Sequence, residues 1–383
     1  MIQGDADATP GQLGADAPLV TVVVPVKNGM PHVERVLHAL DEQELDAPFE
    51  VIVIDSGSTD PSLERAQAMA SRRPERFRVV EIDPSTFGHG RTRNLGAAMS
   101  STPFVAFLTH DAMPADEHWL ANLLRPLRDD ERVAGVFSRH LAYAEHGPYM
   151  ALELEQHFKG LAAFPVCEMT DARRYSRDEG LRKVYHFYSD NASCLRRSVW
   201  EVHPYPDIDF AEDQIWAKTI IERGWKKAFA WDSVVYHSHD YSPFELFRRS
   251  YDEARALNEL FGYKYLTSRR ALLRQWLKAT GRDWRTGWAR SWWRVHPFAM
   301  ARRPALNLAK MTGLYLGTQN PDYVRRRENL VSRDRALKAL RRDTADLAPT
   351  GTRQEGGARR RIVQAGRRSA TAENHSKRST RSG

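Results

Sequence analysis

Residues 19–28 read Leu-Val-Thr-Val-Val-Val-Pro-Val-Lys-Asn, a run of β-branched residues that ends in a polar turn. Valine and threonine side chains favour extended backbone. The run over 19–26 is apolar on both of its faces, so the sheet that contains it must be covered on both sides. We therefore predict that residues 19–26 form a buried strand of a parallel α/β sheet.

The same pattern continues along the next part of the chain. Apolar runs alternate with segments whose apolar residues recur at helical spacing, which predicts an open parallel sheet with right-handed crossovers. Ligands of such sheets bind beyond the carboxyl ends of the strands, where Asn28, Asp55, His110 and Asp111 stand. The expected strands are 49–54, 77–82 and 104–108, and the expected helices are 31–40, 61–71 and one that begins near Thr92, after the glycine-rich loop 87–90.

Past residue 130 the pattern is mixed and then becomes helical. We expect strands near 133–137 and 191–195, a helix around 212–223, a last strand at 234–236 and helices from 244 to about 345. The ends of the chain are polar and poor in apolar residues, as in disordered segments. The predicted organisation is a disordered leader (1–17), a catalytic domain (18–262), a basic Trp-rich helical extension (263–345) and a disordered basic tail (346–383).

The net charge of +8 conceals a division between two parts of the chain. Residues 1–260 sum to −13, residues 261–350 to +14 and residues 351–383 to +7. The basic character is thus entirely C-terminal. Any acidic partner, such as an anionic membrane or a nucleic acid, would therefore be expected to contact residues 261–383.

Several classes of protein are excluded by what the sequence lacks. Two cysteines, Cys167 and Cys194, are too few for a disulfide framework or a cysteine zinc site. No apolar run approaches the ~20 residues of a membrane-spanning helix, and the polar start lacks the features of a secretory signal. The glycine patterns of dinucleotide-binding and P-loop proteins and the G-x-S-x-G hydrolase elbow are also missing. We expect a cytoplasmic protein.

Each candidate site residue, taken alone, has an ordinary structural explanation. Asp55 and Asp60 could be turn and helix-capping residues, and Asp111 could be a loop carboxylate. Glu212 and Asp213 could be first-turn acids favoured by the helix dipole. A His-x-His pair such as 237–239 is as often structural as metal-binding. The functional interpretation depends on the joint order of these residues.

That joint order resembles family 2 inverting glycosyltransferases of the GT-A type. The resemblance extends over about residues 19–250 and implies a GT-A-like nucleotide-binding sheet with helices on both faces. The glycine-rich loop and the histidine-rich segment look most like the rhamnosyltransferase branch, which implies dTDP-rhamnose as the donor. The segments that carry it are Val24-Pro-Val-Lys-Asn28, Val53-Ile-Asp-Ser-Gly-Ser-Thr-Asp60, Gly88-His-Gly-Arg-Thr-Arg-Asn-Leu-Gly96, Leu108-Thr-His-Asp-Ala112, Phe210-Ala-Glu-Asp-Gln-Ile-Trp216 and His237-Ser-His239.

The resemblance implies a role for each matching residue. Asp55 would accept hydrogen bonds from the base or ribose of the donor, in a pocket lined by Pro25, Val26 and Asn28. Arg93 and Asn94 would hold the nucleotide at a helix N-terminus, and Arg93 would stabilise charge on the leaving group. His110 and Asp111 would also contact the donor, and Glu212 would contact the acceptor or the donor sugar.

The resemblance also implies a divalent cation and a general base. Thr109-His110-Asp111 stands where the family has Asp-x-Asp, so the first aspartate is missing and Asp111 remains. Asp111 with His239 or His237 would hold Mg²⁺ or Mn²⁺. Asp213 would take the proton of the acceptor hydroxyl during a single inverting displacement. The acceptor would be a glycan or a lipid-linked glycan in cell-surface polysaccharide assembly.

Other interpretations remain open for the enzyme and for its basic end. A sugar-nucleotide-binding protein with impaired catalysis, or a nucleotidyltransferase, would carry many of the same residues. Residues 261–300 hold half of the chain's ten tryptophans, which could pack helices together or dock on an anionic membrane at the inner face of the cell. Nucleic-acid binding would explain the charge, but no nucleic-acid motif accompanies it.

Overall fold

The computed structural model describes residues 17–208 and 210–319, together with 324, 326, 331 and 332. The predicted tail (346–383) and all but the last residue of the predicted leader lie outside this range. One sheet contains all of the described strands, in the order β3-β2-β1-β4-β8-β6-β9-β5, with β7 paired to β9. The strands are β1 (Val20–Val26), β2 (Phe49–Asp55), β3 (Phe77–Glu81), β4 (Phe104–Leu108), β5 (Met113–Pro114), β6 (Val133–Leu141), β7 (Val166–Cys167), β8 (Ala192–Arg196) and β9 (Lys226–Tyr236).

The sheet is parallel in its first half and mixed in its second. Strands β3, β2, β1 and β4 run parallel, as the alternation of strands and helices predicted. Strand β8 is antiparallel to both β4 and β6, whereas β6 and β9 are parallel. The chain enters β8 at the edge where β4 ends, and the N–H of Thr109 donates to the carbonyl of Asn191 there. The start of β8 therefore lies beside the carboxyl ends of its neighbours.

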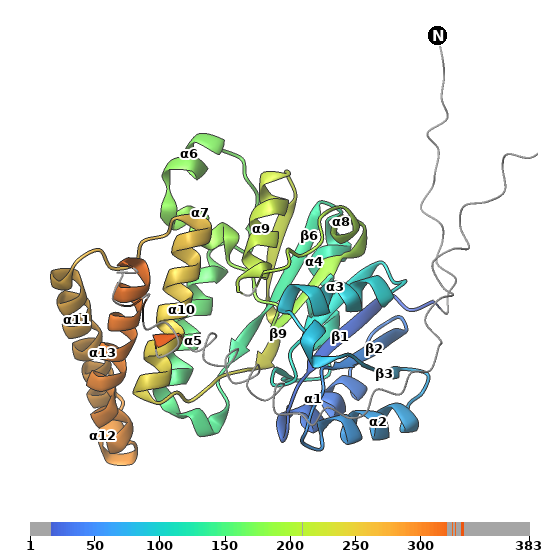
Figure 1. The fold of residues 1–383 in the computed structure, drawn as a ribbon, viewed down its shortest axis with the longest axis horizontal. Helices are drawn as coiled ribbons and strands as arrows, with labels where there is room; N and C mark the ends of the chain where they lie inside the picture. The colour runs from blue at the N-terminus through green and yellow to red at the C-terminus, as the bar shows by residue number, and fades with distance from the viewer. Residues whose placement is uncertain (1–16, 209, 320–323, 325, 327–330, 333–383) are drawn as a thin grey trace, which may run out of the picture. The chain divides into compact units, whose positions relative to one another are not determined.

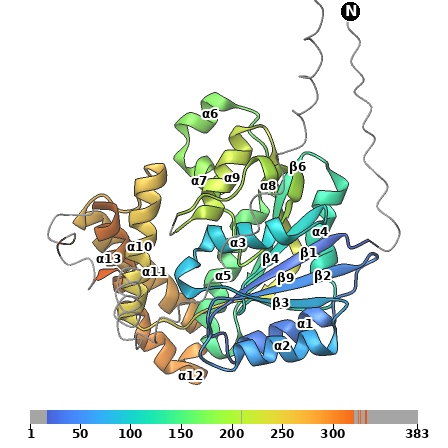
Figure 2. The same cartoon turned by 45° about the vertical axis from the view of Figure 1, so that its right-hand side comes forward.

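Helices cover both faces of the sheet, which confirms the predicted fold class (Figure 2). Strand β1 shows why its sequence is apolar throughout: Val22 packs into the core on one face and Val23 into the core on the other. The first face carries α1 (His32–Asp41), α2 (Ser62–Arg72) and α4 (Trp119–Asp129), and the second carries α3 (His89–Met99), α5 (Gly147–Ala162), α8 (Arg197–Val202) and α9 (Glu212–Glu222). Two shorter helices, α6 (Ala172–Arg177) and α7 (Glu179–His186), precede β8.

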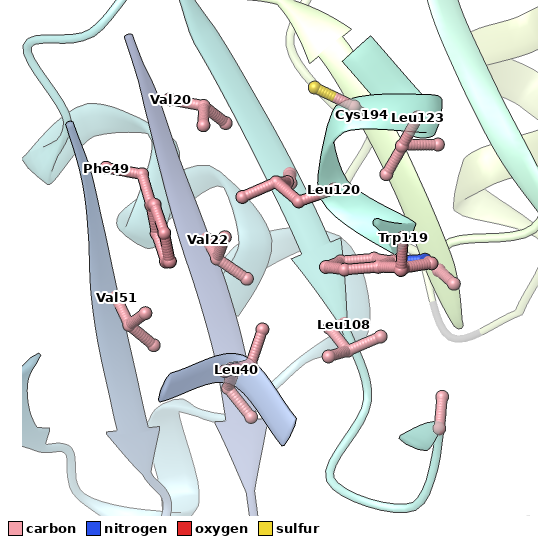
Figure 3. Packing of buried hydrophobic residues seen from close by; sticks show 14 of the residues in the cluster. Val20, Val22, Leu40, Phe49, Val51, Leu108, Trp119, Leu120, Leu123 and Cys194 are labelled. Atoms are coloured by element: carbon pink, nitrogen blue, oxygen red, sulfur yellow. The ribbon is translucent and has the colours of Figure 1, made fainter. Parts of the chain in front are cut away.

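A fully buried tryptophan lies at the centre of the first core. Trp119 packs among apolar side chains of β1, β4 and α1, including Val22, Leu108 and Leu40 (Figure 3). Its indole N–H donates to the hydroxyl of Ser138 at 3.0 Å, so the one polar atom of the ring is satisfied. Burial of each such side chain contributes about 1.5–3 kcal/mol to the stability of the fold.

Three elements differ in extent from the sequence prediction. Strand β6 ends at Leu141 rather than near residue 137. Helix α3 begins at His89, inside the glycine-rich loop, rather than near Thr92. Strand β9 begins at Lys226 rather than at residue 234, although its first residues are polar. The ammonium group of Lys227 is buried there and donates to the carbonyls of Val184, Tyr185 and Phe187, which offsets the cost of burying its charge.

A helical region follows the sheet, as expected (Figure 1). It contains α10 (Pro243–Phe261), α11 (Arg269–Ala289), α12 (Trp292–Val295) and α13 (Pro297–Gln319). Helix α13 lies directly on α10, because a Cβ at Gly313 would come within 2.4 Å of the Phe247 carbonyl oxygen. None of the described helices is both long enough and apolar enough to cross a membrane. The domain boundary expected at 262/263 stays a prediction.

Candidate functional site

The predicted site residues gather at one edge of the sheet. Strands β1, β2 and β4 end there, and so do β6 and β9, which run in the same direction. Because carboxyl ends of parallel strands share an edge, the residues that follow them become neighbours despite their separation in sequence. Pro25 and Val26 lie in the last part of β1, where Val26 pairs with Asp55 of β2.

Asp55 is buried and keeps one oxygen available. Its Oδ1 accepts hydrogen bonds from the N–H groups of Gly57 and Ser58, each at 2.9 Å. Its Oδ2 is buried without a hydrogen-bond partner among the residues that the structure describes. A buried carboxylate oxygen without a donor is costly unless a ligand supplies one. Asp55 therefore offers an acceptor for an N–H or O–H group of a ligand.

The turn after β1 is fastened to the turn after β2. Asn28 has left-handed backbone (φ 48°), and its side-chain oxygen accepts from the N–H of Thr59 at 2.7 Å. Asp60 accepts from the N–H groups of Met30 and Ser62, which gives it the turn role that its sequence context suggested. The turn that holds Asn28 therefore lies against the turn that follows Asp55, and Asp60 contributes hydrogen bonds to both turns.

Asp111 meets both histidines of the His-x-His segment. The short strand β5 carries the chain across from β4 to β9, where Met113 pairs with Tyr236. This pairing brings Asp111 Oδ1 to 3.6 Å from Nε2 of His237, and Asp111 Oδ2 to 3.7 Å from Nε2 of His239. One ligand atom from each residue lies within 4.8 Å of the other two. The structure thus brings both histidines to Asp111.

The donor set of these three residues fits a divalent cation. Two imidazole nitrogens and a carboxylate suit Mn²⁺ better than Mg²⁺, because Mg²⁺ prefers oxygen ligands. Burial by itself would raise the pKa of Asp111, but His237, His110 and His239 together lower it below its ordinary value. Burial lowers the pKa of His237, which keeps its ring neutral and able to ligate.

His110 lies toward the first strand rather than among the metal candidates. A Cβ at Gly29 would come within 2.9 Å of Cδ2 of the His110 ring, so the ring packs against the turn after β1. Glycine is required at residue 29 by this close approach. His110 therefore stands between the turn that holds Asn28 and the cluster around Asp111.

A second acidic cluster is buried at the start of α9. Ala211 has left-handed backbone (φ 60°) and precedes Glu212 and Asp213. Arg93 of α3 lies inside this cluster: its Nη1 donates to Oε1 of Glu212, and its Nε lies 3.5 Å from Oδ2 of Asp190. Arg93 is 5% exposed. Its guanidinium is therefore paired with protein carboxylates in this structure.

Asn94, the other residue predicted to hold the nucleotide, is also engaged by the protein. Its side-chain oxygen accepts from the indole N–H of Trp200 at 2.8 Å and from the N–H of Tyr205 at 3.0 Å. Its amide nitrogen donates to the carbonyl of Tyr205. We propose that Arg93 and Asn94 hold the second half of the site in place instead of contacting the nucleotide.

Asp190 was not among the predicted residues. It is 1% exposed, and its Oδ1 accepts from Ser193 at 2.6 Å and from Tyr205 at 3.1 Å. Nothing in the local sequence distinguishes it from a turn residue before a strand. Its place in the cluster is recognised only from its contact with Arg93, which lies 97 residues earlier in the sequence.

The environment of Asp213 raises the affinity of its carboxylate for a proton. Its Oδ1 accepts from the N–H of Gln214 at 2.8 Å, and its Oδ2 accepts from the N–H of Asp190 at 3.4 Å. Burial and the nearby charges of Glu212 and Asp190 raise the pKa of Asp213 well above its ordinary value, against the opposing effect of Arg93. A carboxylate with a raised pKa is suited to accept a proton near neutral pH.

Comparisons with known proteins identify relatives of this chain. Residues 21–202 match the family model described as glycosyl transferase family 2. The O-antigen chain rhamnosyltransferase RfbN of Salmonella typhimurium is 32% identical over 236 residues, which cover 61% of this chain and 70% of the relative. The O-antigen chain rhamnosyltransferase WbaN of Salmonella anatum is 31% identical over 239 residues, 61% of this chain and 71% of the relative.

A solved structure shows the same fold. The mannosyltransferase PcManGT of Pyrobaculum calidifontis, in complex with GDP-Man and Mn²⁺, superposes with a TM-score of 0.52 and 18% identity. The match covers 80% of this chain and 91% of that chain. At this identity the similarity supports the fold, a GT-A-like sheet with a helical C-terminal region, as the sequence predicted.

The position of Arg93 predicts a large effect on stability. Arg93→Ala should lower the free energy of unfolding by about 3–5 kcal/mol, because it leaves buried carboxylates without a counter-charge. The loss should be smaller at about pH 5 than at about pH 8, since protonation then neutralises the carboxylates whose pKa values are raised. Urea denaturation measures both effects.

The matched control is Arg91→Ala. Arg91 is on the same helix but forms an exposed ion pair with Asp207, so its loss should cost at most about 1 kcal/mol. An Arg93→Ala variant as stable as the Arg91→Ala variant at neutral pH would show that Arg93 does not support the cluster.

Proposed function

The chain belongs to glycosyltransferase family 2, and on this premise we propose that it transfers rhamnose from dTDP-rhamnose to a hydroxyl group of a glycan or lipid-linked acceptor. The names of RfbN and WbaN support rhamnose as the sugar and polysaccharide assembly as the setting. The observation that carries the proposal is the order of groups along one sheet edge: Asp55, the Asp111 cluster and Asp213 follow one another there.

The donor nucleotide is proposed to lie beside β1 and β2. The unpartnered Oδ2 of Asp55 would accept a hydrogen bond from the base or ribose. Asn28, with Pro25 and Val26, would form the wall of this pocket, and His110 would lie on the side toward the diphosphate. Asp55 and Asn28 are fixed by their own turns, so the pocket needs little rearrangement to bind.

The residues proposed to hold the cation are Asp111, His237 and His239. A bound Mn²⁺ would neutralise charge on the diphosphate of the donor as the bond to the sugar breaks. The guanidinium of Arg93 is paired with Glu212 and Asp190. We therefore propose that the charged leaving group is held through the cation at Asp111, His237 and His239.

Asp213 is proposed as the general base. In an inverting displacement the acceptor oxygen forms a bond to the anomeric carbon, the bond from that carbon to the diphosphate oxygen breaks, and the acceptor hydroxyl gives up its proton. The carboxylate of Asp213 would receive that proton. Glu212 is held by Arg93 and would orient the start of α9 rather than take the proton.

Removal of the base should abolish transfer without removing the donor. We expect Asp213→Asn to lower kcat about 10²–10⁴-fold, with the Kd for dTDP-rhamnose unchanged. Release of the nucleoside diphosphate measures turnover, and calorimetry measures binding. Asp207→Asn, which changes an exposed carboxylate of the neighbouring loop, should turn over as the parent does.

Three results would contradict this assignment. Normal turnover by Asp213→Asn would exclude it as the base. Release of pyrophosphate by the parent chain would indicate nucleotidyl transfer, and donor binding without any turnover would indicate a binding protein.

The cation proposal predicts a binding defect that does not depend on activity. Asp111→Asn should weaken Mn²⁺ binding by more than about 10–100-fold, the cost of disturbing even an outer partner of a metal site. Calorimetry with MnCl₂ measures this, and Asp116→Asn, an exposed carboxylate nearby, is the control. Equal Mn²⁺ affinity in Asp111→Asn and the parent would place the cation elsewhere.

A basic and aromatic face of the helical region supports contact with an anionic membrane. Residues 269–319 contain eleven lysines and arginines and one acid, Asp283, which is buried. Trp276 and Trp284 donate to carbonyls of α13, so these two rings pack the helices together. Trp288 and Trp293 are 62% and 41% exposed and lie in contact with each other, with centroids 5.4 Å apart. Exposed tryptophan beside arginine suits the headgroup region of an anionic bilayer.

The membrane proposal predicts that binding to anionic vesicles depends on Trp288 and Trp293. Trp288→Ser with Trp293→Ser should reduce sedimentation of the full chain with phosphatidylglycerol vesicles about tenfold, and added salt should weaken binding by the parent. Val202→Ser removes an equally exposed apolar side chain from α8 and should have no effect. Equal sedimentation of the double variant and the parent would dismiss the membrane proposal.

A further inference from the structure

The strand order determines where the residues proposed for the nucleotide, the cation and the base lie along the carboxyl edge of the sheet. Strands β2 and β1 carry the nucleotide residues, and β4 follows with Asp111. Strand β8 comes next, and Asp190 just before it contacts Asp213 at the start of α9. Strands β6 and β9 follow β8 in the order. The segments after β6 and β9 therefore lie farther from β1 and β2 in the strand order than β4 does.

A cavity of about 230 Å³ lies in the region beyond β6 and β9. Its walls come from residues 145–150 at the start of α5, the loop after β9, α10 and α13, and α10 packs against α13 (Figure 1). The residues used below are His146, Tyr149, Asp240, Tyr241, Phe298 and Arg302. No part of the proposed nucleotide pocket contributes to this lining.

One wall residue touches the candidate metal cluster, and a second touches the segment that carries its histidines. His146 Nδ1 and the hydroxyl of Ser238 share a hydrogen bond of 2.6 Å, and Ser238 stands between His237 and His239. The ring of Tyr241 lies against the ring of His239, with centroids 5.4 Å apart. The cavity therefore begins where the Asp111 cluster ends, and a ligand inside it would lie next to that cluster.

The walls combine aromatic surfaces with charged groups. Tyr149, Tyr241 and Phe298 supply rings, and Asp240 and Arg302 form an ion pair of 3.6 Å, with both side chains about half exposed. An aromatic surface suits the C–H face of a sugar ring, while charged groups at the margin bind its hydroxyls. The charges in the ion pair balance, so the lining does not select a strongly charged ligand.

We infer that this cavity binds the saccharide end of the acceptor. The inference rests on the proposed function, and the stereochemistry of that function supports it. In an inverting displacement the acceptor attacks the anomeric carbon from the side opposite the leaving diphosphate. A cavity next to the Asp111 cluster, with no residue of the proposed nucleotide pocket in its lining, is suited to hold an acceptor that approaches from that opposite side.

A thiol label can block the cavity selectively. Phe298 is 84% exposed, and the native Cys167 and Cys194 are both buried, so a cysteine at residue 298 can be labelled alone. Phe298→Cys in the full chain is treated with a bulky maleimide, and the unlabelled variant shows whether the substitution itself matters. Phe244→Cys with the same label is the matched control, because Phe244 is 59% exposed on α10 and does not line the cavity.

The probes are methyl hexopyranosides of rhamnose, mannose, galactose and glucose, which lack an alkyl chain that could bind exposed tryptophans. Saturation-transfer NMR measures their binding, and calorimetry measures the binding of dTDP-rhamnose. We expect at least one glycoside to bind the parent. The label at residue 298 should weaken that binding about tenfold or more by occupying the cavity, with the Kd for dTDP-rhamnose unchanged.

The outcomes separate this inference from the proposed function. Unchanged glycoside binding after labelling at residue 298, an equal loss after labelling at residue 244, or no glycoside binding by the parent would each overturn the cavity assignment. Failure of the parent to bind any nucleoside diphosphate sugar would instead overturn the proposed function, whatever the label does to glycoside binding.

Discussion

One buried guanidinium holds together the acidic half of the site. Arg93 of α3 contacts Glu212 at the start of α9, 119 residues away, and the segment before β8 through Asp190. Three carboxylates lie within this buried cluster, and a buried charge without a partner costs several kcal/mol. Arg93 supplies the counter-charge that lets these segments meet. The orientation of Asp213 depends on this meeting, because the N–H of Asp190 donates to its carboxylate.

The direction of the strands determines the rest of the site. Parallel strands bring Asp55 and Asp111 to one edge, and the crossing from β4 to β5 carries Asp111 to the histidines that follow β9. The antiparallel strand β8 adds its starting end to the same edge, so Asp190 arrives there although its strand runs the other way. The residues proposed for the nucleotide, the cation and the base therefore come from segments that meet at one edge of the sheet.

The features that were predictable from the sequence are those encoded in short stretches of it. Strand β4 was predicted with its observed bounds, because its apolar run is bounded by turn residues, and the resemblance placed Asp55 and Asp111 beside their strands. Features that depend on distant contacts were not predictable. The start of β9 was missed because Lys227 is charged, and the carbonyl groups that offset its charge lie some 40 residues away in the sequence. The pairing of Arg93 with Asp190 is likewise apparent only in the folded chain.

The basic end has two roles that its composition did not separate. Arg303 of α13 bonds to Asp283 of α11 and to Glu153 of α5, and Trp276 and Trp284 close the same helices together. This network fixes α13 against α5, so both helices can form walls of one cavity. Trp288 and Trp293, which contact each other and are exposed, lie just before α13 in the chain, the helix that lines the cavity through Phe298. If the acceptor is anchored in the membrane by a lipid, the same helices would contact both its saccharide end and the membrane. Under the membrane proposal, the positive charge of these helices would serve contact with an anionic bilayer instead of a nucleic acid.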